Sequence, residues 1–396
     1  MELYVHIPFC IKKCAYCDFA SYPGRSDAFP GYIDALMQEA DTRIRELGSI
    51  APETLYIGGG TPSILPLPLM EKLLEGLALR FPMHGCLERT MEVNPGTVTP
   101  DFLRMIRDGG INRISMGMQA KQAHLLSMLG RIHDWDTVKR TADAIHEIGF
   151  LHLNLDLMFG LPGQTREDWR ETLQAALSLS PDHLSCYGLI PEEGTPLKTA
   201  LDKGTLALPD EETERAMYDD ALMMLSEAGF AQYEISNFAR SGCLCRHNLG
   251  YWCQIPYLGL GCSAASMLPG DGVECIYYRE TNPSDLDAYL QMMREKAFQK
   301  RDVDRIGPRD AMFETMMLGL RMTHGVSESY FYHMHGTSLA SVFGEVLCEE
   351  EKRGLVTHKD GWWYLTRRGM DIQNTVLVDL MESMEKWNAG PSGQQK

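Results

Sequence analysis

Three cysteines near the N-terminus constrain this chain more than any other feature of its sequence. Cys10, Cys14 and Cys17 directly follow a short, mostly apolar segment at residues 4–9, with a spacing of three and then two intervening residues. Three thiolates this close can ligate three irons of a cubane cluster, which normally has four Cys ligands. The fourth iron is then open to a small chelating molecule, as an open position is on a catalytic zinc.

A structural zinc site and unrelated thiols are the alternatives. Zinc sites favour paired C-x₂₋₄-C units with two further ligands downstream. This spacing differs from that pattern, and the sequence offers no obvious fourth ligand nearby. The spacing therefore favours the cluster.

Length and composition limit the class of protein. A chain of 396 residues permits two or three domains, and a net charge of −17 disfavours broad nucleic-acid binding. No apolar run approaches the length of a membrane span, which leaves only peripheral membrane contact open. A first strand from about Glu2 leaves no room for a signal peptide, and the odd number of cysteines, 11, argues against a complete disulfide framework. We expect a cytoplasmic protein with reduced thiols.

The first half of the chain alternates short β-like runs with amphipathic segments, which predicts a parallel α/β fold. Six such units are fewer than the eight of a closed barrel. The candidate strands are residues 3–7, 54–57, 90–93, 113–116, 151–158 and 183–189.

Polar or glycine-rich motifs lie in or directly after the first five candidate strands. Because active sites of parallel barrels lie at the carboxyl ends of the strands, we expect these motifs on one rim. A Gly-Gly-Gly run is also typical of a tight β–α turn, so it is weak evidence alone. The motifs are the cysteine loop and residues 58–62, 92–95, 117–119 and 156–163.

The cysteine motif after an apolar strand resembles the radical S-adenosylmethionine (SAM) superfamily. Residues 4–10 and the aromatic Tyr16 look like the opening of the branch that contains oxygen-independent coproporphyrinogen III dehydrogenase and the haem chaperones of the HemW family. The resemblance implies a partial (β/α)₆ TIM-like barrel and a [4Fe–4S] cluster on Cys10, Cys14 and Cys17. It also implies SAM on the open iron and an electron donor for the cluster.

The same resemblance implies a SAM site on the rim. The turn of Gly59, Gly60 and Thr61 would hold the methionyl amino group, and Glu92 would bind SAM through acceptor oxygens. Tyr4 would lie under the cluster loop. The alternatives are a structural turn, a solvated Glu92 and a core aromatic.

Gln119, Arg131 and Asp156 align with ligands of a second SAM in the coproporphyrinogen enzyme. In this chain they could serve one SAM, another ligand or structure alone, and Arg131 could form a salt bridge at the rim. Two departures match the chaperone branch instead of the dehydrogenase. Asp18 and Phe19 follow the third cysteine where the dehydrogenase has Gly-Cys, and because the motif begins at residue 4 we expect no N-terminal extension like that of the dehydrogenase.

A second motif, His-Asn-x-x-Tyr-Trp at residues 247–252, resembles the signature that the HemW family associates with haem binding. Histidine is a usual haem ligand, and Tyr and Trp offer flat apolar faces to a porphyrin. The alternatives are a turn capped by His247 with core aromatics and haem ligation by a Cys thiolate. A metal site is the third alternative, formed by Cys243, Cys245, His247 and Cys253.

We expect a radical SAM partial barrel over residues 1–232, a connecting segment with the second motif over 233–300, and a smaller C-terminal α+β domain over 301–388. A disordered tail would cover 389–396. The order of helix, strand, turn, strand and helix from Leu347 onward resembles a winged helix. Its basic pairs, residues 352–353 and 367–368, lie in acidic surroundings, so we expect no nucleic-acid partner.

These features favour a haem chaperone-like radical SAM protein that binds haem and delivers it to haem-accepting proteins. Its oligomeric state and the use of SAM cleavage in turnover stay open. One alternative is a radical SAM enzyme acting on a tetrapyrrole, either a coproporphyrinogen III decarboxylase or a haem-modifying methyltransferase. Another is a redox-sensing regulator that uses the winged-helix-like end.

Overall fold

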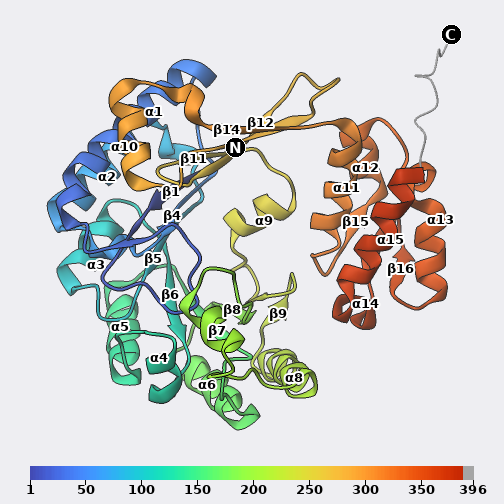
Figure 1. Cartoon of the computed structure of the whole chain (residues 1–396), viewed down its shortest axis with the longest axis horizontal. Coiled ribbons are helices and arrows are strands. Elements are labelled where there is room, and N and C mark those ends of the chain that lie inside the picture. The colour runs from blue at the N-terminus through green and yellow to red at the C-terminus, as the bar shows by residue number, and fades with distance from the viewer. Residues whose placement is uncertain (387–396) are drawn as a thin grey trace.

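The computed structural model describes residues 1–386 and contains a large α/β body and a smaller C-terminal domain (Figure 1). Each has its own hydrophobic core. The tail expected at 389–396 lies outside the described residues. Among the described helices, none combines the length and the apolar character needed to cross a membrane.

Six parallel strands form the centre of the large body, and each pairs with the next one along the chain. This succession is that of a singly wound barrel, and the expected fold class is confirmed. The strands are β1 (Glu2–Ile7), β4 (Thr54–Gly59), β5 (Glu88–Val93), β6 (Arg113–Gln119), β7 (His152–Phe159) and β8 (His183–Gly188).

Helices cover the outer face of these strands (Figure 1), except α7 (Pro196–Asp202), whose Leu197 amide donates to the Ala15 carbonyl of the cysteine loop. Polar caps fix where several begin: Asp134 accepts from the Thr137 amide, and Thr165 forms a capping box with Asp168. Trp169 is fully buried between two of these helices and donates its indole N–H to the Met217 carbonyl at 2.7 Å. The helices are α1 (Phe29–Leu47), α2 (Leu67–Arg80), α3 (Pro100–Asp108), α4 (Ala123–Met128), α5 (Trp135–Ile148), α6 (Arg166–Ser178), α7 (Pro196–Asp202) and α8 (Glu211–Glu227).

The sheet continues beyond the barrel strands at both edges. β10 (Asn237–Ala239) and β9 (Ala231–Gln232) extend it beside β8, while β11 (Tyr257–Leu260) pairs parallel to β1. The antiparallel strands β12 (Ala265–Pro269), β13 (Tyr277–Thr281) and β14 (Asp302–Ile306) follow, with α10 (Leu286–Glu295) packed on α1.

Helix α9 (Arg246–Trp252) contains the whole second motif and covers the amino-terminal end of the barrel. The Glu88 carboxylate at the start of β5 accepts from the backbone amides of Arg246 and His247, both at 3.1 Å. Because the cysteine loop follows the carboxyl end of β1, the two sequence motifs lie at opposite ends of the barrel.

The C-terminal domain has the element order of a winged helix around a three-stranded sheet, β15-β17-β16. Arg321 pairs with the fully buried Glu234 of the large body at 2.7 Å, and the Tyr330 hydroxyl donates to the Cys253 carbonyl at 2.8 Å. Its elements are α11 (Pro308–Gly319), β15 (Val326–Ser327), α12 (Glu328–His335), α13 (Leu339–Lys352), β16 (Val356–Lys359), β17 (Trp362–Leu365), α14 (Arg367–Asp371) and α15 (Gln373–Lys386).

Candidate metal and cofactor site

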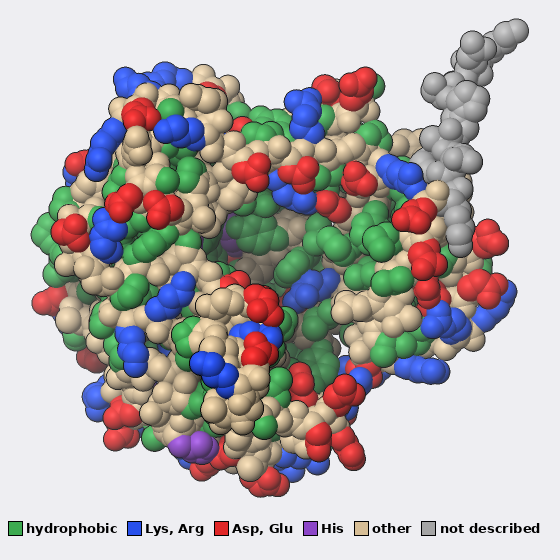
Figure 2. Space-filling view, viewed as in Figure 1, with side chains coloured by type: hydrophobic (Ala, Val, Ile, Leu, Met, Phe, Trp, Pro, Cys, Tyr) green, Lys and Arg blue, Asp and Glu red, His purple; other side chains and the backbone are tan. Residues whose placement is uncertain are grey.

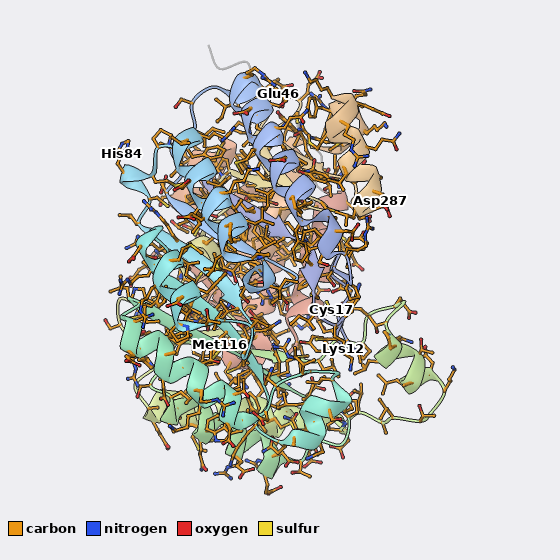
Figure 3. All side chains as sticks on the ribbon, turned by 90° about the vertical axis from the view of Figure 1, so that its left-hand side faces the viewer. Lys12, Cys17, Glu46, His84, Met116 and Asp287 are labelled. Atoms are coloured by element: carbon orange, nitrogen blue, oxygen red, sulfur yellow. The ribbon has the colours of Figure 1, made fainter. Side chains whose placement is uncertain are left out.

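The cysteine loop stands on the carboxyl end of β1 and is closed at its base. β2 (Phe9–Cys10) pairs with β3 (Tyr22–Pro23), and the amide of Ala15 donates to the Leu129 carbonyl at 2.9 Å. Figure 3 shows Lys12 and Cys17 close together and well apart from His84. Because the loop follows the carboxyl end of β1, it stands on the rim that the strand ends form.

A cavity of about 420 Å³ lies between this loop and the strand ends. All sequence-predicted site residues except Tyr4 and His247 line it. The structure thus brings together Cys10, Cys14, Cys17, Tyr16, Gly59, Gly60, Thr61, Glu92, Gln119, Arg131 and Asp156.

The three thiols suit a cluster better than a single ion. None forms a disulfide, and their sulfur atoms do not all lie within 4.8 Å of one another, the spacing needed to share one metal ion. A cubane is larger and accepts thiolates that lie further apart, and soft thiolates select Fe–S clusters. The loop therefore fits the expected cluster, with Cys10, Cys14 and Cys17 as its ligands.

The glycine turn packs against the base of the cysteine loop. Gly59 has a φ of 110°, and a Cβ there would lie 2.5 Å from the His6 ring. A Cβ on Gly60 would lie 2.6 Å from the carbonyl oxygen of Phe9, which is backbone and cannot swing away. Glycine is needed here for close packing, and the same exposed backbone borders the cavity.

A hydrogen-bonded chain joins two of the cysteines. The Thr61 hydroxyl lies 3.5 Å from the Cys10 sulfur and accepts from Asn94 at 2.8 Å. Asn94 accepts in turn from Arg131 at 2.6 Å, and Arg131 lies 3.7 Å from the Cys14 sulfur.

Two features of this series of hydrogen bonds were not foreseen from the sequence. Within the described residues Arg131 forms no ion pair with a carboxylate, so the interpretation as a rim salt bridge is wrong. Asn94 was not singled out as a site residue, although it belongs to the motif at residues 92–95.

Glu92 and Asp156 place two carboxyl groups on the cavity wall. Burial, and then the nearby Asp156 charge, raise the pKa of Glu92 to about 7, while hydrogen bonds from Tyr56 and the Gly59 amide oppose the rise. Burial also raises the pKa of Asp156, which accepts from Asn154 and Ser115. A cationic ligand would offset the cost of ionising these groups.

Gln119 ends β6 in a conformation that side chains rarely adopt. Its φ is 64°, and the register of β6 against β7 shifts between Gly117 and Gln119. Such backbone is costly for a non-glycine residue and gathers at functional sites. Here it lets the nearly buried Gln119 line the cavity.

Tyr4 lies below the cavity and supports the cysteine loop through His6. Its hydroxyl bonds to Nδ1 of His6 at 2.9 Å, and Nε2 of His6 bonds to the Ala20 carbonyl at 3.0 Å. Since a carbonyl only accepts, Nε2 carries the proton and Nδ1 accepts from Tyr4. These two hydrogen bonds connect Tyr4 in the barrel interior to the cysteine loop at Ala20. His6 was missed because a histidine in an apolar strand gives no specific signal.

His247 does not border the cavity and is 1% exposed. Nδ1 bonds to the Thr54 hydroxyl at 2.7 Å and Nε2 to the Tyr251 hydroxyl at 2.9 Å, while the ring stacks on Tyr56. Burial lowers the His247 pKa to about 3. Neither nitrogen is free for iron in this conformation, so iron ligation by the expected residue His247 would first require these two hydrogen bonds to break.

The alternative metal site on the second motif does not form. The four side chains do not gather around one point, and the Cys245 thiol donates to Glu88 at 3.4 Å. His247 uses both ring nitrogens in hydrogen bonds instead.

Comparisons with known proteins agree with this geometry. The radical SAM superfamily model matches residues 4–176, and the HemN C-terminal domain model matches residues 306–372. The chain is 36% identical to "Heme chaperone HemW" of Bacillus subtilis over 94% of this chain and 97% of that protein. It is 33% identical to "Heme chaperone HemW" of Escherichia coli over 95% and 97%.

A solved structure shows the same fold over nearly the whole chain. Coproporphyrinogen III oxidase (HemN) from Escherichia coli, described as a radical SAM enzyme, superposes with a TM-score of 0.83 and 25% identity. The superposition covers 96% of this chain and 89% of that one. The superfamily implies a [4Fe–4S] cluster and SAM at the cysteine rim, and the full-length relatives narrow the assignment further. The chain belongs to the HemW family of radical SAM proteins.

Proposed function

We propose that this protein is a cytosolic haem chaperone that carries a [4Fe–4S] cluster and SAM at the rim cavity and passes haem to haem-accepting proteins. The observation that carries the proposal is the similarity, over nearly the full length of both chains, to proteins named haem chaperones. The eleven cysteines are all unpaired, which suits a reducing compartment.

Different rim residues would bind the cluster and SAM. Cys10, Cys14 and Cys17 would hold the cluster, which supplies one electron and an open iron. Glu92 and the backbone of Gly59 and Gly60 would orient SAM. Arg131 places a positive charge 3.7 Å from the Cys14 sulfur, next to the negative charge that a thiolate-ligated cluster would carry.

An aromatic cavity beside the second motif suits one edge of a porphyrin. It measures about 250 Å³, is mostly apolar, and lies between α9 and the C-terminal domain. Figure 2 shows the hollow between the two bodies, with hydrophobic side chains in its walls. The walls include Trp252 of the motif together with Tyr330 and Trp362. The cavity is smaller than a porphyrin, so part of the macrocycle would stay outside, as suits a carrier that releases its cargo.

His324 is the histidine that lines this cavity. Its ring meets Trp362 edge-on at 5.3 Å, and no hydrogen bond of the ring is found among residues 1–386. The indole nitrogen of Trp252, another residue of the cavity wall, is buried and has no hydrogen-bond partner among the described residues. His324 therefore has nitrogens available to iron where His247 has none, and we assign His324 as the haem ligand and His247 as support for α9.

Haem titration of matched variants tests this assignment. We expect His324→Ala to weaken haem binding at least about tenfold and to shift the Soret band, because an iron ligand is lost. His247→Ala should leave the Soret band in place, and His84→Ala, at an exposed site, is the control. A Soret shift only in His247→Ala would put haem on the motif histidine. No haem binding by the unaltered protein would remove the chaperone proposal itself.

The cluster has a separate test. Anaerobically reconstituted Cys10/Cys14/Cys17→Ala should lose the broad visible absorbance and the acid-labile sulfide of the parent. Full retention of iron and sulfide would refute the assigned ligands.

A radical enzyme acting on a tetrapyrrole is the second candidate, because the HemN structure matches nearly the whole chain. Reduced protein incubated without oxygen with SAM and coproporphyrinogen III distinguishes the two functions. We expect no loss of carboxylate groups. Loss of two carboxylates per porphyrinogen would replace the chaperone proposal with the decarboxylase.

A further inference from the structure

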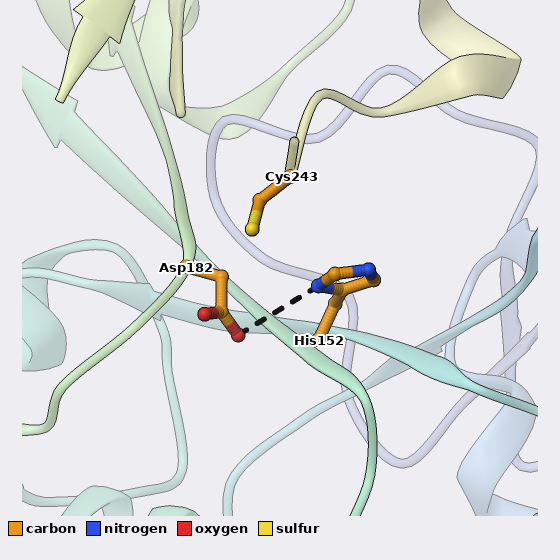
Figure 4. A group of neighbouring side chains, drawn as sticks. All are labelled: His152, Asp182 and Cys243. Atoms are coloured by element: carbon orange, nitrogen blue, oxygen red, sulfur yellow. Dashed lines mark ion pairs between the residues drawn. The ribbon is translucent and has the colours of Figure 1, made fainter. Parts of the chain in front are cut away.

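A second group of metal-ligating side chains lies at the amino-terminal end of the barrel, away from the cysteine loop. His152 is the first residue of β7, Asp182 directly precedes β8, and Cys243 lies in the turn between β10 and α9 (Figure 4). One ligand atom from each lies within 4.8 Å of the others, and no other such group occurs in residues 1–386.

The geometry leaves a place for a positive charge among these atoms. Nδ1 of His152 is shielded from solvent but has no hydrogen-bond partner. It lies 3.9 Å from a carboxylate oxygen of Asp182, which is too far for a hydrogen bond. A buried polar atom without a partner is unfavourable, and a metal ion between the three side chains would provide the missing partner.

Hydrogen bonds fix the backbone at Cys243 and Asp182, and His152 stands on a strand. Arg113 donates to the Cys243 carbonyl at 2.8 Å, and the Cys243 amide donates to the Arg240 carbonyl at 3.0 Å. The Arg240 amide donates in turn to the Asp182 carbonyl at 2.9 Å. Ligands fixed by strands and by such bonds need little rearrangement to bind an ion.

We propose that His152, Asp182 and Cys243 bind one Zn²⁺, with water as the fourth ligand. Imidazole nitrogen, carboxylate oxygen and thiolate sulfur are the donors that zinc takes in tetrahedral sites. Binding releases the Cys243 thiol proton to solvent and involves no redox change. The His152 and Asp182 side chains are 19% and 31% exposed, so ion and water can enter.

The bound ion would anchor the turn that leads into α9. Cys243 stands three residues before Arg246, the first residue of that helix. Zinc would therefore fix the second motif at the end of the barrel opposite to the cluster. This role is independent of the proposed haem function.

Cobalt titration of the full-length protein tests the site. The background is Cys10/Cys14/Cys17→Ala, because the cluster-loop thiols can also bind zinc. After chelation, we expect one equivalent of Co²⁺ to give a thiolate-to-cobalt absorbance that Zn²⁺ abolishes. Cys243→Ser should remove the absorbance and weaken metal binding at least about tenfold. The control is Cys348→Ser at an exposed cysteine of α13, which should change neither.

Cobalt absorbance that survives Cys243→Ser, or a folded background variant that binds no metal, would overturn the proposal. Should the background variant fail to fold, zinc content after anaerobic cluster reconstitution is measured in the otherwise unaltered protein. One zinc per chain, lost in Cys243→Ser and kept in Cys348→Ser, supports the site. Equal zinc content in the parent and Cys243→Ser overturns it.

Discussion

Glu92 makes the stability of the cofactor-free protein depend on pH. Its pKa is about 7 in the folded state and 4.5 in the unfolded chain. Between these values the folded state holds a proton that the unfolded state has lost. The free energy of unfolding should therefore fall as pH rises, by up to about 1.4 kcal/mol per pH unit.

Glu92→Gln should remove this part of the pH dependence, because an amide does not titrate. Urea unfolding at pH 5, 6 and 7 measures the difference in slope between variant and parent. Glu71→Gln, at an exposed position of α2, controls for the loss of one charge. Parallel pH profiles for Glu92→Gln and the parent would contradict the raised pKa.

Gly60 is the position of the glycine turn where a side chain meets only backbone. Gly60→Ala would place a Cβ 2.6 Å from the Phe9 carbonyl and 2.9 Å from its nitrogen. We expect a loss of about 1–3 kcal/mol in the free energy of unfolding and poorer iron retention after reconstitution. Gly31→Ala, an exposed α1 position where a Cβ meets nothing within 4 Å, should be neutral or slightly stabilising. Equal stability of the two variants would contradict the close packing.

Residues that stand in motifs could be predicted, whereas residues that support them could not. Cys10, Gly60 and Glu92 line one cavity as expected because parallel strands bring their carboxyl ends together. His6 acts through contacts with Tyr4 and Ala20, and such contacts exist only after folding.

At the scale of elements, α9 depends on His247 as a structural residue. His247→Ala removes bonds to Thr54 and Tyr251, leaves both hydroxyls without this partner and opens a cavity beside Tyr56. We expect a loss of about 2–4 kcal/mol in the free energy of unfolding, with faster hydrogen exchange in α9.

His247 also makes the free energy of unfolding of the parent protein depend on pH. Its folded pKa of about 3 lies below the ordinary 6.5, so stability is complete above about pH 6.5 and falls as pH drops toward 3. His247→Ala should lack this contribution. His84→Ala serves as control, and a matching small effect in both variants would contradict a structural role for His247.

The barrel strands were predictable, but the edge strands were not. Short β-like runs that alternate with amphipathic segments predicted all six barrel strands to within a few residues. β11 contains Gly259 and is followed by Gly261, which in sequence indicate a loop. In the sheet a Cβ on Gly259 would lie 2.1 Å from the Ala265 carbonyl oxygen, so tertiary packing and not strand propensity places glycine there.

At the scale of the whole molecule, three of the four residues in the basic pairs of the C-terminal domain form ion pairs within the protein. Lys352 pairs with Glu349, Arg353 with Glu350 and Asp379, and Arg367 with Asp219 and Asp371. A nucleic-acid interface needs free positive charge on one face. This pairing favours a role for the winged helix in docking onto the large body over one in DNA binding.

Arg321 holds the C-terminal domain to the large body through an ion pair with a buried carboxylate. Its guanidinium pairs with the fully buried Glu234 at 2.7 Å and lies 4.5 Å from the centre of the Trp252 ring. Arg321→Ala would leave the Glu234 carboxylate buried without its ion-pair partner, which costs about 3–5 kcal/mol. We expect the C-terminal core to unfold separately, so that urea unfolding shows two transitions and Trp252 becomes exposed early.

The exposed pair between Arg367 and Asp219 also joins the two bodies and provides the matched control. Because solvent screens this pair, Arg367→Ala should cost no more than about 1 kcal/mol and keep one transition. Arg321→Lys should fall between the two, since lysine keeps the charge but not the planar contact with the indole. Equal effects of Arg321→Ala and Arg367→Ala would show that the buried ion pair does not hold the domain, and the aromatic cavity would then lose its fixed wall.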